Sequence, residues 1–244
     1  MSILIAGHSA ARRVAWDVFF RLLPGELTIK HRYTGDPLRL HSLRHRDYWL
    51  RGRGRHYPEL LALGGLIRPG DCVIGIGGEI GFVPLRLAML TGPTGTVHVF
   101  EPGRTDLPYL RSNIARRPNV HLVESAVGSA VGALPYEEHG PDGGRVTRMV
   151  PVTTIDAYVG EHQLGPKLIT IAATGAEWEI LMGARSCLRW HRPALMLTVH
   201  RYRLEIAHLL REEGYEFWSV AGEPLPEIPP GPATVIGRPK DQRT

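Results

Sequence analysis

The chain has 244 residues, of which 43% are hydrophobic and 22% are charged, and its formal net charge is +5. This length fits one α/β domain with an N-terminal addition, and the hydrophobic fraction is ordinary for a protein that buries a core. No apolar run approaches the roughly 20 residues that a membrane-spanning helix needs, so we expect no membrane partner.

The start of the chain lacks the basic segment and long apolar core of a secretory signal peptide. The two cysteines, Cys72 and Cys187, show neither a metal-binding spacing nor a disulfide framework. We therefore expect a protein of the reducing cytoplasm.

In chain order, the first predicted unit is an N-terminal extension, residues 1–56, which precedes the main domain, residues 57–244. Residues 11–23 have a helical pattern that ends at a Pro-Gly pair. Residues 26–33 and 37–41 favour short strands. The extension is thus predicted to be a small helical and strand addition that forms a cap.

The extension is basic. Between residues 30 and 56, eight Lys or Arg residues are balanced only by Asp36 and Asp47, so this stretch accounts for the excess positive charge. A basic cap attracts an acidic substrate, a carrier domain or a nucleic acid, but basic stretches are commonly just solvated surface. We expect no nucleic-acid partner. The histidines of the stretch have no spacing that indicates a metal site, and we expect no metal: His31, His41, His45 and His56.

From residue 57 onwards, strand and helix patterns alternate. The expected strands are residues 72–76, 96–101, 120–124, 168–172, 194–200, 215–220 and 233–236. The expected helices are residues 57–66, 81–91, 105–116, 176–188 and 203–213. Residues 128–144 are rich in Gly and Pro and favour a hairpin insertion. This alternation predicts a doubly wound α/β domain with a mostly parallel sheet and ligand chemistry at the carboxyl ends of its strands.

A glycine-rich turn after the first strand of this domain is the most informative motif. Gly77, Gly78 and Gly81 let the backbone approach a ligand, and the following helix start offers free N–H groups. Glu101 ends the second strand, where a carboxylate can accept both hydroxyls of a ribose. The motif and this carboxylate together predict a nucleoside site.

The spacing of the glycines narrows the class of ligand that the turn could bind. Counted from Gly75, the dinucleotide fingerprint requires a sixth-position glycine where this chain has Ile80. The looser spacing suits a nucleoside without a pyrophosphate. A nicotinamide-dependent oxidoreductase is the weaker hypothesis, because the chain also lacks a Ser/Tyr-x-x-x-Lys catalytic set.

Five segments, in order and with natural spacing, resemble the FkbM family of methyltransferases: residues 68–81, 92–102, 152–156, 175–181 and 192–200. The match covers roughly residues 57–220. The resemblance implies a seven-stranded, Rossmann-like methyltransferase fold that uses S-adenosylmethionine. It further implies a transferase, mostly an O-methyltransferase, that acts on a small molecule such as a sugar or secondary metabolite.

The resemblance also assigns site residues. Gly77, Gly78 and Gly81 would line the methionine end of the cofactor, and Glu101 would take the ribose hydroxyls. The adenine would be bordered by Glu124, Ser125 and Ala126.

Glu79 stands where the family has Asn. It could return a carboxylate to the cofactor site, or repel the methionine carboxylate. The alternative interpretation, which we favour, is a carboxylate in the first turn of the following helix, where the helix dipole stabilises it.

Charged residues of the family are missing at five positions. An Asp, a Lys, an Asp, a Glu and a Glu are replaced by Gly75, Thr170, Ala172, Thr174 and Thr198. We expect all five to lie near strand ends and face the pocket. Because S-adenosylmethionine is a net cation, losing two carboxylate contacts of about 1.5 to 3 kcal/mol each weakens its binding on the order of 100-fold.

The remaining candidates for acid–base chemistry are His200 and Glu177. His200 ends the fifth strand and can act as a general base near neutral pH, or it is a buried histidine bonded to the backbone. Glu177 follows the turn after the fourth strand. Asp156 is expected to cap the short helix after Thr153 and Thr154.

Two hypotheses follow. The first is a working S-adenosylmethionine-dependent methyltransferase with a small-molecule substrate. The alternative is a pseudo-methyltransferase that no longer methylates. Such a protein would catalyse a cyclisation or rearrangement in a neutral pocket, or serve as a partner subunit. We favour the first, because the loop glycines and Glu101 are present. A homo-oligomer is compatible with both.

Overall fold

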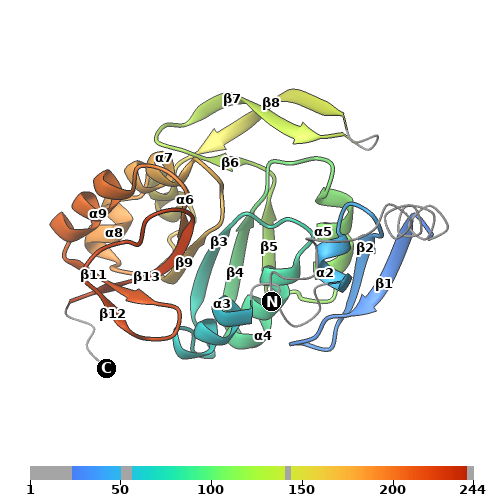
Figure 1. Ribbon diagram of the computed structural model, residues 1–244, viewed down its shortest axis with the longest axis horizontal. Coiled ribbons are helices and arrows are strands. Elements are labelled where there is room, and N and C mark those ends of the chain that lie inside the picture. Colours follow the sequence, from blue (N-terminus) through green and yellow to red (C-terminus); the bar gives the residue numbers. More distant parts are fainter. Residues whose placement is uncertain (1–23, 51–56, 141–143, 241–244) are drawn as a thin grey trace, which may run out of the picture. The chain divides into compact units, whose positions relative to one another are not determined.

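A computed structural model describes residues 24–50, 57–140 and 144–240 of the chain. The chain divides into two compact units, residues 1–55 and residues 56–244. Figure 1 labels the elements of both. The predicted helix over residues 11–23 lies outside the described residues.

The first unit contains an antiparallel hairpin followed by a short helix. Strand β1 (Glu26–Lys30) pairs with β2 (Pro37–His41), and helix α2 (Arg46–Leu50) follows. Leu38 and Leu40 alternate with polar residues along β2 and are fully buried, which gives this small unit its apolar side.

The second unit is built on one eight-stranded sheet. Its parallel part has the order β10 (Ala194–Val199), β9 (Pro166–Ile171), β3 (Cys72–Ile76), β4 (Thr96–Phe100) and β5 (Val120–Val123). Strand β13 (Ala233–Pro239) is antiparallel and lies between β10 and β11 (Tyr215–Ser219). The predicted mostly parallel α/β sheet is therefore confirmed.

The sheet has one strand more than the seven expected. Strand β12 (Pro224–Leu225) lies in a proline-rich segment, residues 223–232, and pairs with β11 through two residues. Proline lacks an N–H group but is tolerated on an edge strand, where one side of the strand needs no partner.

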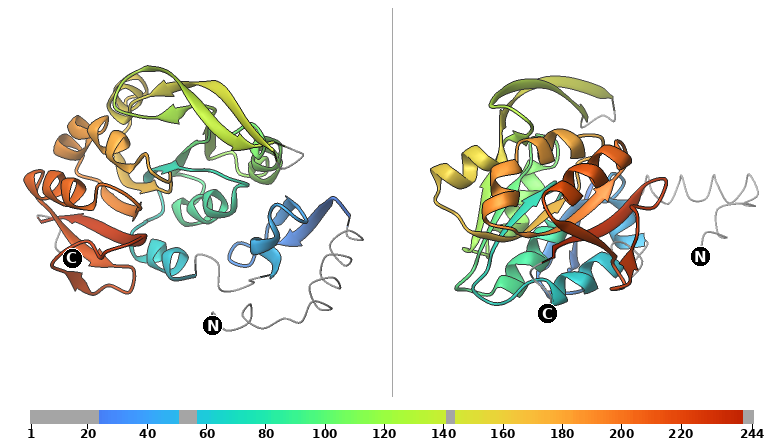
Figure 2. Two further views of the ribbon diagram at one scale, coloured as in Figure 1. Left: turned by 45° about the horizontal axis from the view of Figure 1, so that its top comes forward. Right: turned by 90° about the vertical axis from the view of Figure 1, so that its left-hand side faces the viewer.

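Helices cover both faces of this sheet, as two views of the ribbon show (Figure 2). One face carries α6 (Ile155–Glu161), α7 (Glu177–Met182), α8 (Arg185–Trp190) and α9 (Arg203–Glu212), which bury the largest apolar cluster. The other face carries α3 (Tyr57–Ala62), α4 (Phe82–Thr91) and α5 (Leu107–Ile114). No described helix is both long and apolar enough to cross a membrane.

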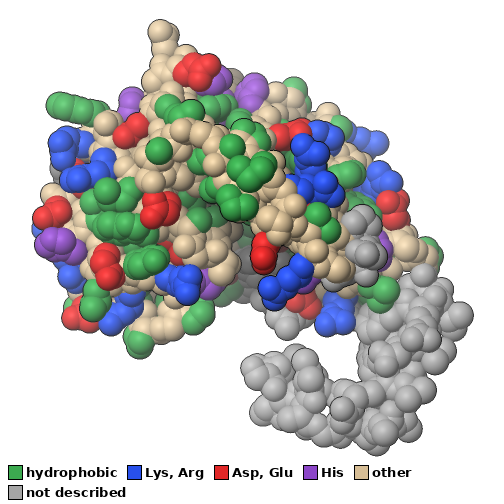
Figure 3. All heavy atoms as spheres, turned by 90° about the horizontal axis from the view of Figure 1, so that it is seen from above, with side chains coloured by type: hydrophobic (Ala, Val, Ile, Leu, Met, Phe, Trp, Pro, Cys, Tyr) green, Lys and Arg blue, Asp and Glu red, His purple; other side chains and the backbone are tan. Residues whose placement is uncertain are grey.

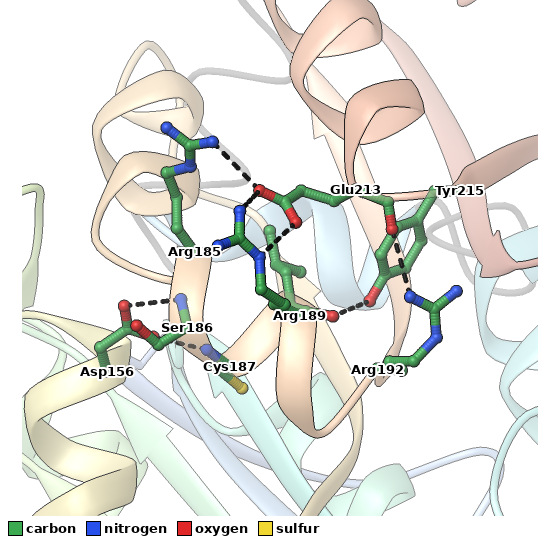
Figure 4. A network of polar contacts seen from close by, with 9 residues as sticks. Asp156, Arg185, Ser186, Cys187, Arg189, Arg192, Glu213 and Tyr215 are labelled. Carbon is green, nitrogen blue, oxygen red and sulfur yellow. Dashed lines mark hydrogen bonds and ion pairs between the residues drawn. The ribbon is translucent and has the colours of Figure 1, made fainter.

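The expected helix over residues 176–188 is two helices, α7 and α8. Gly183 lies between them, and only glycine fits there, because a Cβ atom would lie 2.0 Å from the carbonyl oxygen of Gly128. Asp156 caps α8: its carboxylate accepts from the N–H groups of Ser186 (2.9 Å) and Cys187 (2.7 Å), as Figure 4 shows. The expectation that Asp156 caps its own helix was wrong.

Helix α6 is capped instead by Thr154, whose side chain accepts from the N–H group of Ala157 at 3.0 Å. The network in Figure 4 also ties α8 to the end of α9. The carboxylate of Glu213 pairs with Arg185 (3.1 Å) and Arg189 (3.0 Å). Burial is the largest single influence and raises the pKa of Glu213. The hydrogen bonds and charges of Arg189 and Arg185 together outweigh it, so the net pKa is lowered.

The insertion forms its own three-stranded sheet. Strand β8 (Arg145–Thr153) lies between β6 (Ala126–Val127) and β7 (Gly132–His139), parallel to the first and antiparallel to the second. The hairpin is longer than the predicted insertion, because its second strand continues to Thr153.

A group of aromatic side chains containing three imidazoles lies between β4, β5 and α6. His98 is buried, its Nδ1 atom lies 2.9 Å from the hydroxyl of Tyr158, and its ring stacks on His121. Tyr158 also stacks on His162. Burial, followed by the neighbouring imidazoles of His121 and His162, lowers the pKa of His98 to about 4.

This lowered pKa predicts acid sensitivity. The unfolded chain binds a proton at His98 below about pH 6.5 and the folded chain only near pH 4, so stability is full above pH 6.5 and falls as the pH drops to 4. We expect a loss on the order of 1 to 3 kcal/mol over this range. Urea denaturation of H98Q should show a smaller loss, while H208Q, at an exposed histidine, should match wild type. If the free energy of unfolding of H98Q fell with decreasing pH as steeply as that of wild type, His98 would not be the source of the acid sensitivity.

Candidate functional site

The glycine turn lies at the carboxyl end of β3, as predicted. The backbone of Gly77 has φ +94°, and a Cβ atom there would lie 2.5 Å from the carbonyl oxygen of Ala172 at the end of β9. A Cβ atom on Gly78 would lie 2.7 Å from the side chain of Leu110 on α5. Gly81 has φ +91° and is the N-cap of α4. These glycines are therefore required for close packing within the protein, whatever ligand approaches them.

Glu101 connects two loops of the site. One carboxylate oxygen accepts from the N–H groups of Gly78 (3.0 Å) and Glu79 (2.8 Å), and the other accepts from the N–H group of Gly103 (2.8 Å). The residue is buried. Burial raises the pKa of this carboxyl, and the three backbone bonds oppose that rise. A carboxylate has about four acceptor positions, and within the described residues these backbone bonds use three of them.

Glu79 is not part of the following helix. Helix α4 begins at Phe82 and has no acidic residue in its first turn, so the favoured helix-terminus interpretation was wrong. The backbone of Glu79 is left-handed, with φ +44°. Asn, which the resembled family has at this position, adopts this conformation more readily than Glu. The side chain reaches solvent, yet desolvation by surrounding protein, then the charges of Glu101 and Asp106, raise its pKa to about 7. Glu79 is therefore only partly ionised at neutral pH.

The β7–β8 hairpin is fastened to the segment that follows Glu101. Glu138 accepts from the N–H group of Thr105 at 2.9 Å and pairs with Arg148 at 3.2 Å. Tyr136 lies beside Gly103. Burial and the surrounding carboxylates, Glu101 first, raise the pKa of Tyr136 to about 12, so its phenol remains a hydrogen-bond donor.

Tyr136 and Glu138 were not expected at the site. Both side chains lie on the half-buried face of β7, but no local pattern in the sequence pointed to them. Figure 3 views the molecule from the side of this hairpin. Acidic, basic and hydrophobic side chains are mixed there, so no single charge dominates this face.

The residues expected to border an adenine have structural contacts of their own. Glu124 forms an ion pair with Arg111 of α5. The Ser125 hydroxyl lies 3.0 Å from the carbonyl oxygen of Pro151, and Ala126 belongs to β6. The segment thus joins the main sheet to the hairpin sheet, and its adenine role stays a prediction.

The two catalytic candidates are in contact. Nδ1 of His200, just after β10, lies 2.7 Å from Oε1 of Glu177, the first residue of α7. The same oxygen accepts from the N–H group of Gly175 at 3.0 Å. Glu177 is fully buried, and within the described residues its second oxygen has no hydrogen-bond partner. The His200 side chain is 26% exposed.

The roles of the imidazole nitrogens depend on the protonation of this pair. When Glu177 is ionised and His200 is neutral, Nδ1 donates its proton to Glu177, because a carboxylate only accepts hydrogen bonds. Nε2 then has a free lone pair and is the atom that can accept a proton from a substrate. The alternative of a histidine bonded to the backbone was wrong.

Three of the five neutral replacements do not face an open site. Gly75 on β3 is directly opposite Thr170 on β9, and both are buried under Leu87 of α4. The hydroxyl of Thr198 lies 3.0 Å from that of Thr234 on β13. The expectation that all five face the pocket was wrong for these three, because they lie within the sheet.

Ala172 and Thr174 are different. Both follow the end of β9 and are exposed. Only at these two positions would a carboxylate be open to a ligand without being buried in the sheet.

Solved structures share the fold of the second unit. Methyltransferase FkbM from Methylobacillus flagellatus KT matches with a TM-score of 0.53 and 21% identity, over 71% of this chain and 45% of that chain. Precorrin-6y C5,15-methyltransferase from Geobacter metallireducens GS-15 has a TM-score of 0.47 and 17% identity, over 76% of this chain and 89% of that chain. Aeropyrum pernix fibrillarin, solved with S-adenosyl-L-methionine, has a TM-score of 0.47 and 14% identity, over 74% of each chain.

No protein-family model matches the sequence, and no curated protein matches it. The matched part spans less than half of the Methylobacillus protein. At this identity the likeness shows the fold alone, and it confirms the expected Rossmann-like methyltransferase fold.

The three bonds from Glu101 to the N–H groups of Gly78, Glu79 and Gly103 form what we call the Glu101 clamp. We expect the substitution E101Q to loosen both the glycine turn and the segment after Glu101. A Gln side chain keeps one acceptor oxygen but turns an NH₂ group toward a backbone N–H, so at least one buried donor loses its partner. We expect a loss of about 1 to 3 kcal/mol in the free energy of unfolding. Faster hydrogen exchange at Gly78, Glu79 and Gly103 should accompany it. Unchanged exchange at all three amides would show that the clamp does not hold the loops.

Proposed function

We propose that the protein is an S-adenosylmethionine-dependent methyltransferase, acting on a hydroxyl group of a small molecule. The observation that carries this proposal is the contact between buried Glu177 and His200 at the carboxyl end of β10. Gly77 packs on Ala172 at the same edge of the sheet. A proton acceptor and a nucleoside-type loop at one sheet edge are what transfer to a hydroxyl requires.

The residues present fit the cofactor. Glu101 retains one acceptor position for a ribose hydroxyl, and Glu79 supplies a carboxylate near a cationic ligand. When bound, S-adenosylmethionine supplies a methyl group on a positively charged sulfur. Gly77 and Gly78 form the wall on the methionine side, and residues 124–126 border the adenine.

The chain's own residues supply positioning and proton transfer. Nε2 of His200 accepts the proton of the acceptor hydroxyl as the new bond forms. Glu177 keeps the imidazole oriented and stabilises its positive charge once it is protonated. Because Glu177 is fully buried and bonded to the Gly175 N–H group, the orientation of His200 is set before any substrate binds.

One observation favours the alternative of a pseudo-methyltransferase. The Glu101 carboxylate is largely occupied by backbone N–H groups, and Ala172 and Thr174 add no carboxylate to the sheet edge. Such a site holds a cation weakly, and the same His200–Glu177 pair could then serve a proton transfer in a cyclisation or rearrangement. Cofactor affinity separates the two functions.

Calorimetric titration with S-adenosylmethionine, and separately with S-adenosylhomocysteine, is the direct test. We expect binding of both in the micromolar range. The double variant A172D/T174E restores two open carboxylates, and one new charge-assisted contact of about 1.5 kcal/mol should tighten S-adenosylmethionine binding roughly tenfold. The neutral variant A172N/T174Q is the matched control and should resemble wild type. No binding of either ligand at millimolar concentration would overturn the proposal in favour of the alternative.

The proposed acid–base pair can be tested by steady-state kinetics once a screen with labelled methyl donor has found an acceptor. H200N should lower kcat by about 10²- to 10⁴-fold, because the proton acceptor is lost. E177Q should lower kcat less, since it disturbs only orientation and charge. Neither variant should change the affinity for S-adenosylhomocysteine. A drop in that affinity, or full activity of H200N, would remove His200 from the role of base.

A further inference from the structure

The turns that follow β9 and β10 place aromatic side chains next to both members of the acid–base pair. Trp178 follows Glu177 directly, and Tyr202 is two residues beyond His200. The two rings lie 6.5 Å apart between centroids, at an angle of 43°. Leu204, in the first turn of α9, is 64% exposed, and Tyr202 is 50% exposed. The same two turns are therefore joined twice, by the Glu177–His200 contact and by the Trp178–Tyr202 ring pair.

Tyr202 is held in an unfavourable conformation. Its backbone has φ +54° and ψ +34°, the left-handed region, which is an outlier for a bulky residue. Gly at this position would adopt the same backbone without strain. Strained residues of this kind cluster at ligand sites, where the strain serves to present a side chain. The conformation turns an aromatic ring toward solvent at a position where folding alone favours glycine.

We infer that the acceptor is a phenol, bound with its ring against Tyr202, Trp178 and Leu204 and its hydroxyl at Nε2 of His200. This inference rests on the proposed function and names its substrate class. Offset or tilted contacts with two aromatic side chains select a planar ring over a saturated one. The side chain of Arg201 passes beside Gly175, at the same edge, and its charge favours an ionised oxygen.

The acidity of the acceptor supports a phenol over an alcohol. Imidazoles titrate near pH 6.5 and phenols near pH 10, so transfer of a phenolic proton to an imidazole is uphill by about 3.5 pH units. An aliphatic alcohol is far less acidic than a phenol. A phenol is therefore the hydroxyl whose proton an imidazole base removes at the smaller cost.

The step balances as an in-line displacement. The phenolic O–H bond breaks and its proton moves to Nε2 of His200. An oxygen lone pair forms the new O–C bond to the methyl carbon as the S–C bond breaks. The S–C electron pair stays on sulfur, which becomes a neutral thioether. His200 leaves the step as an imidazolium paired with Glu177 and returns its proton to water.

The probe for this site is 4-nitrophenol, titrated into the full chain without any methyl donor. Its ionised form absorbs visible light, so the titration reports binding and proton transfer together. Matched probes are 4-nitroanisole, which has the ring without the hydroxyl, and cyclohexanol, which has the hydroxyl without the ring. We expect 4-nitrophenol to bind more tightly than either, with a bound spectrum shifted toward the phenolate.

Two variants at one position separate ligand binding from folding. Y202G removes both the ring and the backbone strain, so we expect a folded protein with an unfolding midpoint at or above that of wild type and about fivefold weaker 4-nitrophenol binding. Y202F keeps the ring and should bind like wild type. W190A, at an exposed aromatic on α8, is the control and should leave binding unchanged. H200N should bind 4-nitrophenol without the phenolate shift.

The inference is overturned if Y202G binds 4-nitrophenol as wild type does, or if cyclohexanol binds equally well. It is also overturned if wild type does not bind 4-nitrophenol. These results do not depend on S-adenosylmethionine. A chain that binds 4-nitrophenol at Tyr202 but no cofactor would disprove methyl transfer and leave the phenol site standing, and the reverse result would disprove only the phenol site.

Discussion

The site depends on a single buried carboxylate. Glu101 ends β4 and accepts three backbone N–H groups, two from the turn after β3 and one from the segment that follows Glu101 itself. That following segment is in turn held to the hairpin through Glu138 and Thr105. Two carboxylates, Glu101 and Glu138, therefore link the glycine turn to the β7–β8 hairpin through the segment between them. A buried carboxylate is costly to desolvate, and only its three donors make this arrangement stable.

This dependence gives Glu101 two tasks that compete. The more completely backbone donors satisfy the carboxylate, the less capacity it has for a ribose. One acceptor position is left, which is enough for one strong hydrogen bond rather than the pair that a free carboxylate could accept. The geometry therefore allows a nucleoside to bind while limiting the affinity that Glu101 can contribute.

The register of the strands shows that two of the neutral replacements, Gly75 and Thr170, are neighbours in the sheet. Gly75 and Thr170 face each other across β3 and β9 under the same leucine. In the resembled family these two positions carry an Asp and a Lys, which would be neighbours of opposite charge inside the sheet. Removing only one member of a buried pair leaves an uncompensated charge, whereas removing both is often neutral or stabilising. In this chain neither position is charged, so no ion pair is buried in the sheet at Gly75 and Thr170.

Much of the fold and part of the site could be predicted from the sequence. Alternating strand and helix patterns predicted which segments form the parallel strands. Because the carboxyl ends of parallel strands lie at one edge of a sheet, Gly77, Glu101, Glu177 and His200 could be placed at that edge. What failed depended on packing between distant segments. The residue between α7 and α8, Gly183, packs against the backbone of Gly128, 55 positions earlier in the chain. Asp156 caps a helix 30 residues further along the chain. Neither partner is visible in local spacing, and the same holds for Tyr136 and Glu138 of the hairpin.

The pairing of Glu177 with His200 shows why the site is more than a remnant of a shared fold. A carboxylate that is fully buried, with one oxygen lacking a partner among the described residues, costs stability, and a purely structural position would be better filled by an apolar side chain. The backbone of Tyr202, two residues from His200, adds a second cost. Both costs fall on the two turns that carry Glu177 and His200. Their coincidence is the physical basis for assigning this sheet edge a chemical task.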